Sequence, residues 1–329
     1  HNFAKFVGDQ TRLDYIYALT VADMNATNPN LWNGWRASLM NQLSSETKRT
    51  LRKGLTMVID RKEYLTDIRK RAMTLLKQEG LSLSEIERVW SRVDDEYFLR
   101  ERVSDIIWHT KAIIQEPNSE KPIVLVRNDK SKASDSGYTQ IFVHTKNRKD
   151  LFTSIILAID ELQLNVVDAR IATSKDNEKT FNSFAVLEKN GLSVEENGTR
   201  IERIRSKIED SIEKPEKKSR LLSFRQSSLE QFVSKTRISI NKKNRQNLWV
   251  IEVTTADRPG ILAVIGDSFK KFEIDIISAR ITTLGEKVED IFYVTSNPIK
   301  LGLEQSKADQ LKLALQESLD NHAQKLMNK

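Results

Sequence analysis

Hydrophobic residues in the first third of the chain recur every three or four positions, which is the spacing of amphipathic helices. Two such stripes are Leu13, Ile16, Tyr17 and Leu19, and Trp32, Trp35, Leu39 and Leu43. Asn28-Pro29 separates the two stripes, because proline disfavours a continuing helix. Further helices are predicted over Asp60–Lys77, from Ser82 with Glu85 completing a capping box, and over Val103–Gln115. Strand patterns are lacking here, so this region is predicted to be all-α.

The rest of the chain contains a sequence repeat whose two copies are offset by 110 residues, the separation of Arg170 from Arg280. The helix stripe Leu151, Phe152, Ile155, Ile159 and Leu162 matches Ile261, Leu262, Ile265, Phe269 and Phe272. Both copies then share Ala-Arg-Ile, and Phe184-Ala185-Val186 matches Phe292-Tyr293-Val294 after a two-residue insertion in the first copy. Agreement in register over this length indicates two copies of one structural unit.

Each copy has the pattern strand, helix, strand, strand, helix, with one additional strand in front. The predicted leading hairpins are Ile123–Val126 with Gln140–His144, and Thr236–Ile240 with Trp249–Thr254; the predicted closing helices are Thr199–Glu213 and Glu304–His322. A leading strand joined as a hairpin would lie antiparallel at the sheet edge and close it. The fold class is therefore predicted to be α+β, with an all-α region followed by two four-stranded antiparallel sheets, each covered on one face by two helices.

The junction between the strand Trp249–Thr254 and the following helix has the sequence Asp-Arg-Pro-Gly. Aspartate can cap a helix, proline suits an early helical position, and glycine has no side chain to cover the backbone N–H groups. Such a helix N-terminus can receive a carboxylate, while aspartates can receive an ammonium group. A free amino acid carries both groups. The candidate ligand-binding residues are Asp257, Arg258, Pro259, Gly260, Ile261 and Asp275.

A simple strand-to-helix turn would also explain this tetrapeptide. In the first copy the matching residues are Asn147-Arg148-Lys149-Asp150, which add bulk and an opposing charge at the corresponding position. If only one copy binds ligand by itself, we expect it to be the second. The first copy could then pair with the second and supply the other wall of the site.

Asp23 stands on a helix face of apolar and small residues in the stretch LTVADMNATNPNLWNGW. A carboxylate there would be costly to desolvate unless it meets a metal, a base or a helix end. A capping or hydrogen-bonded aspartate is the alternative interpretation. The four histidines, His1, His109, His144 and His322, show no metal-ligand spacing with Asp23, so no complete metal site is expected in this chain.

Charge and composition narrow the choice of function classes. The net charge is +7, and the segment Pro215–Gln246, with nine basic and two acidic residues, accounts for all of it. We interpret this segment as a solvated linker, with docking to an acidic partner as the alternative, and expect no nucleic-acid binding. No apolar run has the length of a membrane span, and cysteine is absent, which suits a reducing compartment. The chain opens at His1 rather than at a methionine, so we expect a fragment of a longer protein.

The repeat resembles paired ACT domains, which are ferredoxin-like amino-acid-sensing modules. The segments LTVADMNATNPNLWNGWRASL and SARITTLGEKVEDIFYV, joined in this order, resemble the C-terminal part of the bacterial PII uridylyltransferase/uridylyl-removing enzymes. The resemblance covers essentially the whole chain. It implies the end of an HD domain and further helices over 1–118, ACT domains over 119–214 and 233–329, and a basic linker over 215–232.

The resemblance also implies a cytoplasmic enzyme that attaches UMP from UTP to the PII signal protein when glutamine is scarce and removes it when glutamine is abundant. Mg²⁺ or Mn²⁺ would serve the full enzyme, and Asp23 matches the last metal ligand of its HD domain. The other catalytic residues are missing here, so this chain is expected to be regulatory, with glutamine as effector. Alternatives are an HD/ACT stringent-response synthetase/hydrolase, which would carry a single ACT copy, and a non-enzymatic amino-acid-binding ACT protein.

Overall fold

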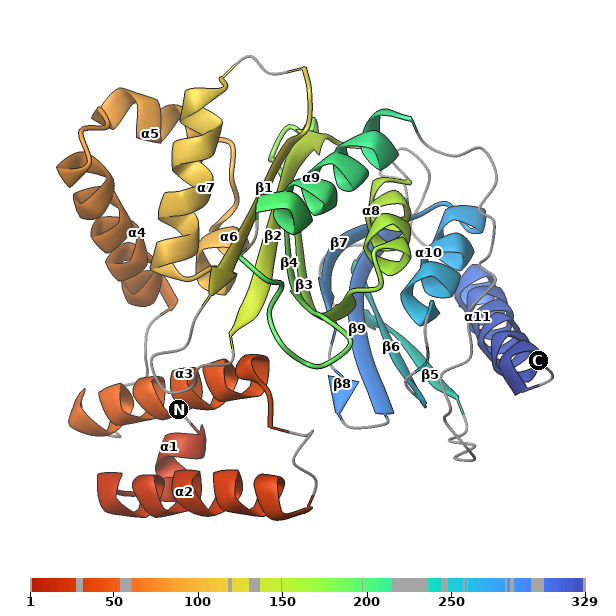
Figure 1. The fold of residues 1–329 in the computed structure, drawn as a ribbon, viewed down its shortest axis with the longest axis horizontal. Coiled ribbons are helices and arrows are strands. Elements are labelled where there is room, and N and C mark those ends of the chain that lie inside the picture. The colour runs from red at the N-terminus through yellow and green to blue at the C-terminus, as the bar shows by residue number, and fades with distance from the viewer. Residues whose placement is uncertain are drawn as a thin grey trace. The chain divides into compact units, whose positions relative to one another are not determined.

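The structure is a computed structural model, shown in Figure 1. It describes residues 2–27, 32–53, 61–117, 120–129, 137–148, 150–196, 198–214, 236–243, 248–256, 258, 260–281, 283–284, 287–296 and 305–327. The predicted linker at 215–232 therefore lies outside the described residues, and the predicted domain boundaries stay predictions. The described chain forms two compact units, His1–Pro117 with Arg127–Gln140 and Leu187–Glu196, and Asn118–Val126 with Ile141–Val186 and Asn197–Lys329.

Helices make up the described part of the chain before residue 118, as the hydrophobic spacing predicted. They are α1 (Asn2–Val7), α2 (Gln10–Thr27), α3 (Gly34–Lys53), α4 (Arg61–Gln78), α5 (Leu83–Trp90), α6 (Asp95–Arg100) and α7 (Val103–Gln115). The predicted bounds of α7 are confirmed at both ends. The capping box is also confirmed, since Ser82 accepts from the N–H of Glu85 while Glu85 accepts from the N–H of Ser82. The two short helices α1 and α6 are additions to the prediction.

The helices α4 to α7 enclose a hydrophobic core. Helix α7 packs against α4 and α5, and α4 also packs against α6. Residues with at most 4% exposure in this core include Ile68, Ala72, Leu76, Ile86, Phe98 and Ile106. Burial on this scale is the main stabilising term for helices of ordinary propensity. The α4–α7 group is therefore a small folded bundle.

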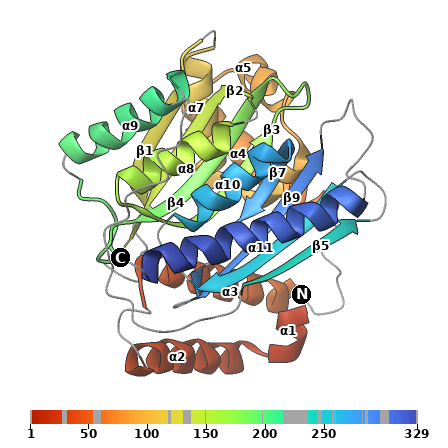
Figure 2. The ribbon, with the colours of Figure 1, turned by 90° about the vertical axis from the view of Figure 1, so that its right-hand side faces the viewer.

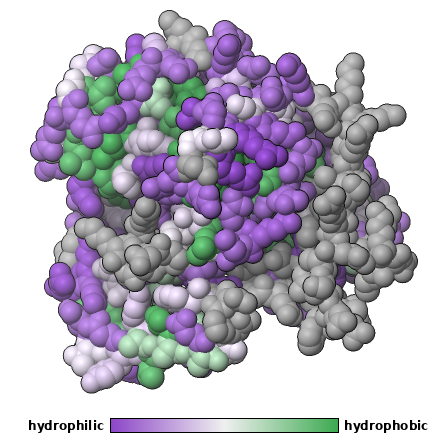
Figure 3. All heavy atoms as spheres, in the orientation of Figure 1, coloured by the Kyte–Doolittle hydropathy of each residue, from purple (hydrophilic) through white to green (hydrophobic). Residues whose placement is uncertain are grey.

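The helices α1 to α3 have the predicted period but a different buried face. Leu13 and Trp35 are buried, whereas Leu19 is 68% exposed and Leu39 and Leu43 are also exposed. Phe6 and Tyr15 add to this exposed apolar surface, and hydrophobic residues reach the surface over α2 at the lower edge of Figure 3. The three- and four-residue spacing therefore predicted helices correctly, while the leucines it assigned to the core are partly solvent-exposed.

The first repeat forms a four-stranded sheet in the order β1-β2-β4-β3. Its elements are β1 (Ile123–Asp129), β2 (Tyr138–Lys146), α8 (Leu151–Glu161), β3 (Asn165–Thr173), β4 (Lys179–Leu187) and α9 (Gly198–Glu213). The leading strand lies at the sheet edge beside the next strand, which confirms the predicted permuted arrangement. Nearly every residue of β4 is buried, so the side chains on both faces of this strand are shielded from water.

The second repeat gives the same path, β5-β6-β9-β7, with the two-residue strand β8 (Thr283–Leu284) paired to β9. Its other elements are β5 (Arg237–Lys243), β6 (Leu248–Ala256), α10 (Ile261–Lys271), β7 (Ile274–Arg280), β9 (Lys287–Ser296) and α11 (Gln305–Met327). The pairs β5–β6, β6–β9 and β7–β9 are all antiparallel. Side chains on one face, including Ile251 and Phe292, are fully buried, so the helix-covered side of this sheet is its core.

The two repeats pack side by side. Strand β3 lies along β7, and helix α8 lies along α10, as Figure 2 shows. The rings of Phe152 and Phe292 meet edge to face with 6.4 Å between centroids, and Lys270 Nζ lies 3.6 Å from Asp150 Oδ2. Gly266 and Thr153 also approach closely, since a Cβ added to the glycine would lie 2.6 Å from the threonine Oγ1. The predicted pairing of the two copies is therefore confirmed.

Candidate functional site

Gly260 occupies the N-cap of α10, with φ 81° and ψ 3°. This left-handed conformation is strained for residues that carry a Cβ, so glycine is the suitable residue here. No side chain caps the helix from this position, and the Gly260 carbonyl accepts the first helical bond from the N–H of Val264 at 3.0 Å. Ile261 is the first residue of this helix, two positions after Pro259. Asp257 and Pro259 themselves lie outside the described residues.

Arg258 is half-buried beside this turn. Burial lowers the pKa of its guanidinium, and the negative charge of Asp320 on α11 opposes that shift. In the first repeat the matching Arg148 donates to the Ser211 carbonyl of α9 at 3.4 Å and to Ser154 Oγ at 3.2 Å. Both arginines thus interact with the last helix of their own repeat. The arginine at this repeated position therefore has a structural role in both repeats, because it links the turn to the last helix of its repeat.

Asp275 does not share the turn with Gly260. On strand β9, Ala256 pairs with Lys287, whereas Asp275 pairs with Thr295. Lys287 and Thr295 are eight positions apart, which corresponds to about 26 Å along a strand. Asp275 and the β6–α10 turn therefore lie at opposite ends of this sheet, and the expectation that Asp275 completes the ammonium side of the same site is wrong. The sequence repeat could not reveal this, because the strand register decides which end of the sheet each residue occupies.

The corresponding turn of the first repeat carries more side-chain contacts. Asp150 is the N-cap of α8, with φ −104°, and its Oδ1 lies 3.4 Å from Arg148 Nε. The second carboxylate oxygen faces Lys270 of the other repeat. Asn147 donates to Asn177 Oδ1 at 3.0 Å. An acidic side chain thus stands at this helix N-terminus, whereas the glycine of the second repeat leaves the equivalent position without one.

Asp23 lies on α2 and is exposed to solvent. The carboxylate of Asp23 is therefore not desolvated. Leu19, on the same helix face, is exposed as well. Among the described residues, no three His, Asp or Glu side chains group into a possible metal site. His109 is fully buried, and its Nδ1 lies 2.8 Å from Tyr97 Oη. The described residues around Asp23 do not by themselves form a site that fits a divalent metal.

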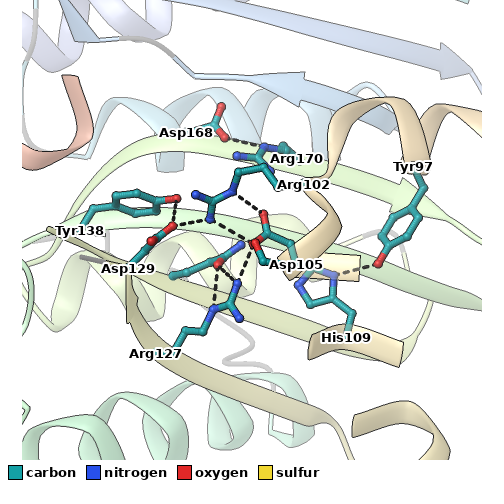
Figure 4. A network of polar contacts seen from close by, with 11 residues as sticks. Tyr97, Arg102, Asp105, His109, Arg127, Asp129, Tyr138, Asp168 and Arg170 are labelled. Atoms are coloured by element: carbon teal, nitrogen blue, oxygen red, sulfur yellow. Dashed lines mark hydrogen bonds and ion pairs between the residues drawn. The ribbon is translucent and has the colours of Figure 1, made fainter. Parts of the chain in front are cut away.

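A polar cluster that sequence reasoning missed lies at one end of β1 and β2 (Figure 4). We call it the Asp105 cluster; it consists of Arg102, Asp105, Arg127, Asp129, Tyr138 and Gln140. The carboxylate of Asp105 is fully buried and accepts from Arg102 Nε and Nη2, each at 3.0 Å, and from Arg127 Nη2 at 2.6 Å. Arg102 also pairs with Asp129. Two guanidinium groups and two carboxylates therefore neutralise one another.

The aromatic and amide members complete the Asp105 cluster. Tyr138 Oη donates to Asp129 Oδ2 at 2.7 Å, and Arg127 Nη2 donates to Gln140 Oε1 at 2.9 Å. The Arg127 guanidinium lies 4.0 Å from the ring centroid of Trp108, a cation–π contact. The ring of Trp35 on α3 meets Tyr138 edge to face at 4.8 Å. Segments far apart in sequence thus meet at this cluster, and only the i, i+3 spacing of Arg102 and Asp105 gave a local signal.

The electrostatics of the Asp105 cluster follow from burial and charge. Burial alone would lower the pKa of Arg102, but Asp105, Tyr138 and Asp129 raise it above its ordinary value. Burial lowers the pKa of Arg127, and Asp105 only partly offsets this. Burial also raises the pKa of Tyr138, against the effect of Arg102. Both arginines stay protonated across the physiological range because an arginine titrates far above it.

The fold and the site define a class of protein: an all-α region followed by two tandem ferredoxin-like, ACT-type domains that pair within one chain. Residues 60–112 match the family model described as the uridylyltransferase GlnD fifth domain. The matched range covers α4 to nearly the end of α7. It thus identifies the helical bundle that precedes the first sheet.

Curated relatives extend the match over most of the chain. Bifunctional uridylyltransferase/uridylyl-removing enzymes from Ectopseudomonas mendocina and Pseudomonas fluorescens are each 41% identical over 296 residues, and that of Pseudomonas putida (strain W619) is 40% identical. Each alignment covers 90% of this chain and 33% of the relative. The chain thus spans about a third of the length of these relatives, and over that third it is similar to a C-terminal portion of the bifunctional uridylyltransferase/uridylyl-removing enzymes.

One solved structure, an unknown protein from Galdieria sulphuraria, covers 55% of this chain at 14% identity and a TM-score of 0.20. That score is too low to support an argument about the fold. Within the described residues, none of the helices combines the length and the apolar character required to cross a bilayer.

Proposed function

We propose that this chain is the regulatory portion of an enzyme that uridylylates the PII signal protein and removes the UMP again, and that its ACT-type pair senses glutamine. The names of the relatives support the two activities. The two repeats, which pack side by side in one chain, support the regulatory role. UTP and PII would be substrates of the full enzyme in the cytoplasm, and Mg²⁺ or Mn²⁺ its metal, with Asp23 as one candidate ligand.

The observation that carries the sensing proposal is the cap of α10. Gly260 leaves the helix N-terminus without a side-chain acceptor, whereas Asp150 occupies the same position in the first repeat. Backbone N–H groups there, together with the positive end of the helix dipole, favour a carboxylate. Arg258 and the buried Ile261 belong to the same turn. The ammonium group of glutamine would be received by residues other than Asp275, which lies at the far end of the sheet.

Thermal unfolding of the 329-residue chain with a panel of amino acids tests this proposal. A ligand at 100 times its dissociation constant stabilises the folded state by about 2.7 kcal/mol, so glutamine should raise the melting temperature by several degrees. The variant Gly260→Ala should melt lower than wild type and lose the shift, because alanine is strained at this φ and adds a Cβ to the turn.

Gly191→Ala is the matched control. Gly191 also has a positive φ, 77°, and a Cβ added there would meet nothing within 4 Å. This variant should carry a similar backbone cost but keep the glutamine-dependent shift. An unchanged melting temperature with glutamine in the wild type, or an undiminished shift in Gly260→Ala, would contradict the assignment.

A further inference from the structure

The Asp105 cluster joins three segments that are distant in sequence. Asp105 lies in the first turn of α7 and Arg102 is its N-cap, while Arg127 comes from the end of β1 and Tyr138 from the start of β2. Both strands are members of the first repeat's sheet. The hydrogen bond from Arg127 to Asp105 therefore joins the β1–β2 hairpin to helix α7 (Figure 4).

The hydrogen bonds to the Asp105 carboxylate favour one position of the hairpin relative to α7. Its Oδ1 accepts from Arg102, Arg127 and Ser104, and its Oδ2 accepts from Arg102. A buried carboxylate that loses one guanidinium is left with an uncompensated charge, so intermediate positions of the hairpin are disfavoured. The ring of Trp108 lies over the guanidinium of Arg127, and the ring of Tyr138 lies 5.8 Å from that of Arg102. A connection of this kind favours one discrete arrangement over its alternatives.

Other ion pairs in the helical region lack these properties. Arg49 and Asp67 meet at 2.9 Å, but their side chains are 32% and 39% exposed, and both belong to helices. Exposed pairs of this type contribute little and are easily exchanged for water. The Asp105 cluster is thus the buried ionic connection, among the described residues, that holds the hairpin of the first repeat to α7.

We propose that the Asp105 cluster is the joint through which ligand binding by the ACT-type pair changes the state of α7, with Asp105 as the positioning residue. This proposal rests on the proposed function, because it takes glutamine as the ligand. A ligand that shifts the sheet of the pair moves the ends of β1 and β2, and the cluster passes that displacement to α7. The helical bundle then serves as the output of the sensor.

Hydrogen exchange of the 329-residue chain, measured with and without glutamine, tests the proposal. In the wild type, glutamine should slow exchange in the first turn of α10 and also in α7, each by about threefold or more, because coupled elements share a stability change. In Asp105→Asn the slowing in α10 should remain while that in α7 is lost. Asp67→Asn, which removes only the exposed pair, should behave as the wild type does.

If Asp105→Asn does not fold, Arg127→Lys takes its place. Lysine keeps the charge but has no planar fork with which to bind Asp105 and Gln140 together, so it should give the same loss. If the Asp105 cluster has only a structural role, the variant should show faster exchange in α7 but keep the slowing by glutamine. That result would contradict the proposal. A wild-type α7 that does not respond while α10 does would overturn it as well. A chain in which neither helix responds and no glutamine binds would instead show that the proposed ligand is wrong, and the joint would fall with it.

Discussion

A close contact between the two repeats gives a prediction that can be worked out from distances. Gly266 of α10 faces Thr153 of α8, and a Cβ at Gly266 would lie 2.6 Å from Thr153 Oγ1, 3.3 Å from its Cβ and 3.4 Å from its Cγ2. Thr153 is 7% exposed, so its side chain is already enclosed. Gly266→Ala should therefore push α8 and α10 apart.

The expected magnitude is the difference of two terms. Overpacking an enclosed contact costs about 1–3 kcal/mol, whereas replacing glycine by alanine within a helix recovers about 1 kcal/mol. The free energy of unfolding should thus fall by up to about 2 kcal/mol. Gly198→Ala is the matched control, because Gly198 opens α9 and nothing lies within 4 Å of its added Cβ. That variant should be neutral or slightly more stable.

A double-mutant cycle isolates the contact itself. Thr153→Ala removes the Oγ1 and Cγ2 atoms that the new Cβ would meet, so it should relieve part of the strain of Gly266→Ala. Urea unfolding followed by circular dichroism should give a favourable interaction energy of about 1 kcal/mol between the two substitutions. Additive effects, or a Gly266→Ala chain as stable as Gly198→Ala, would refute the close packing of α8 on α10.

Two further predictions concern helix ends and pH. Ser82→Ala removes the acceptor of the α5 capping box and should lower stability by about 1 kcal/mol in urea unfolding, whereas an equal loss in Ser84→Ala would argue against the cap. Burial, with Glu202, Glu213 and Asp210 nearby, raises the pKa of Glu209 on α9. A raised carboxyl pKa means that stability is highest below the unfolded pKa of about 4.3 and falls as pH rises through the folded pKa. Glu209→Gln should therefore raise the melting temperature at pH 7 and not at about pH 3.5; the reverse order would contradict the burial of this carboxyl.

Local patterns predicted most of the fold. The apolar spacing and Pro117 fixed the extent of α7, and Ser82 with Glu85 fixed the start of α5, since these signals act within one helical turn. The repeat predicted the second sheet from the first, including the leading edge strands. The short helices α1 and α6 were missed because six residues are too few for a clear hydrophobic period.

Non-local geometry set the limits of the site prediction. Asp275 matched the chemistry of an ammonium partner, but the pairing of β7 with β9 places it at the wrong end of the sheet. Arg127 and Asp129 carry no local signal, since Arg127 binds Asp105 in the preceding helix and Asp129 binds Arg102 at the N-cap of that helix. Gly260 was chosen for the absence of a side chain, and its positive φ supplies a second reason for glycine at that position.

The interaction of the second repeat with an amino acid is most directly tested by titration calorimetry of the 329-residue chain with glutamine. A saturable heat at one glutamine per chain, unchanged in Gly191→Ala and absent in Gly260→Ala, is the expected result. Two glutamines per chain would show that the first repeat binds despite Asp150, and a flat titration would contradict glutamine sensing by this pair.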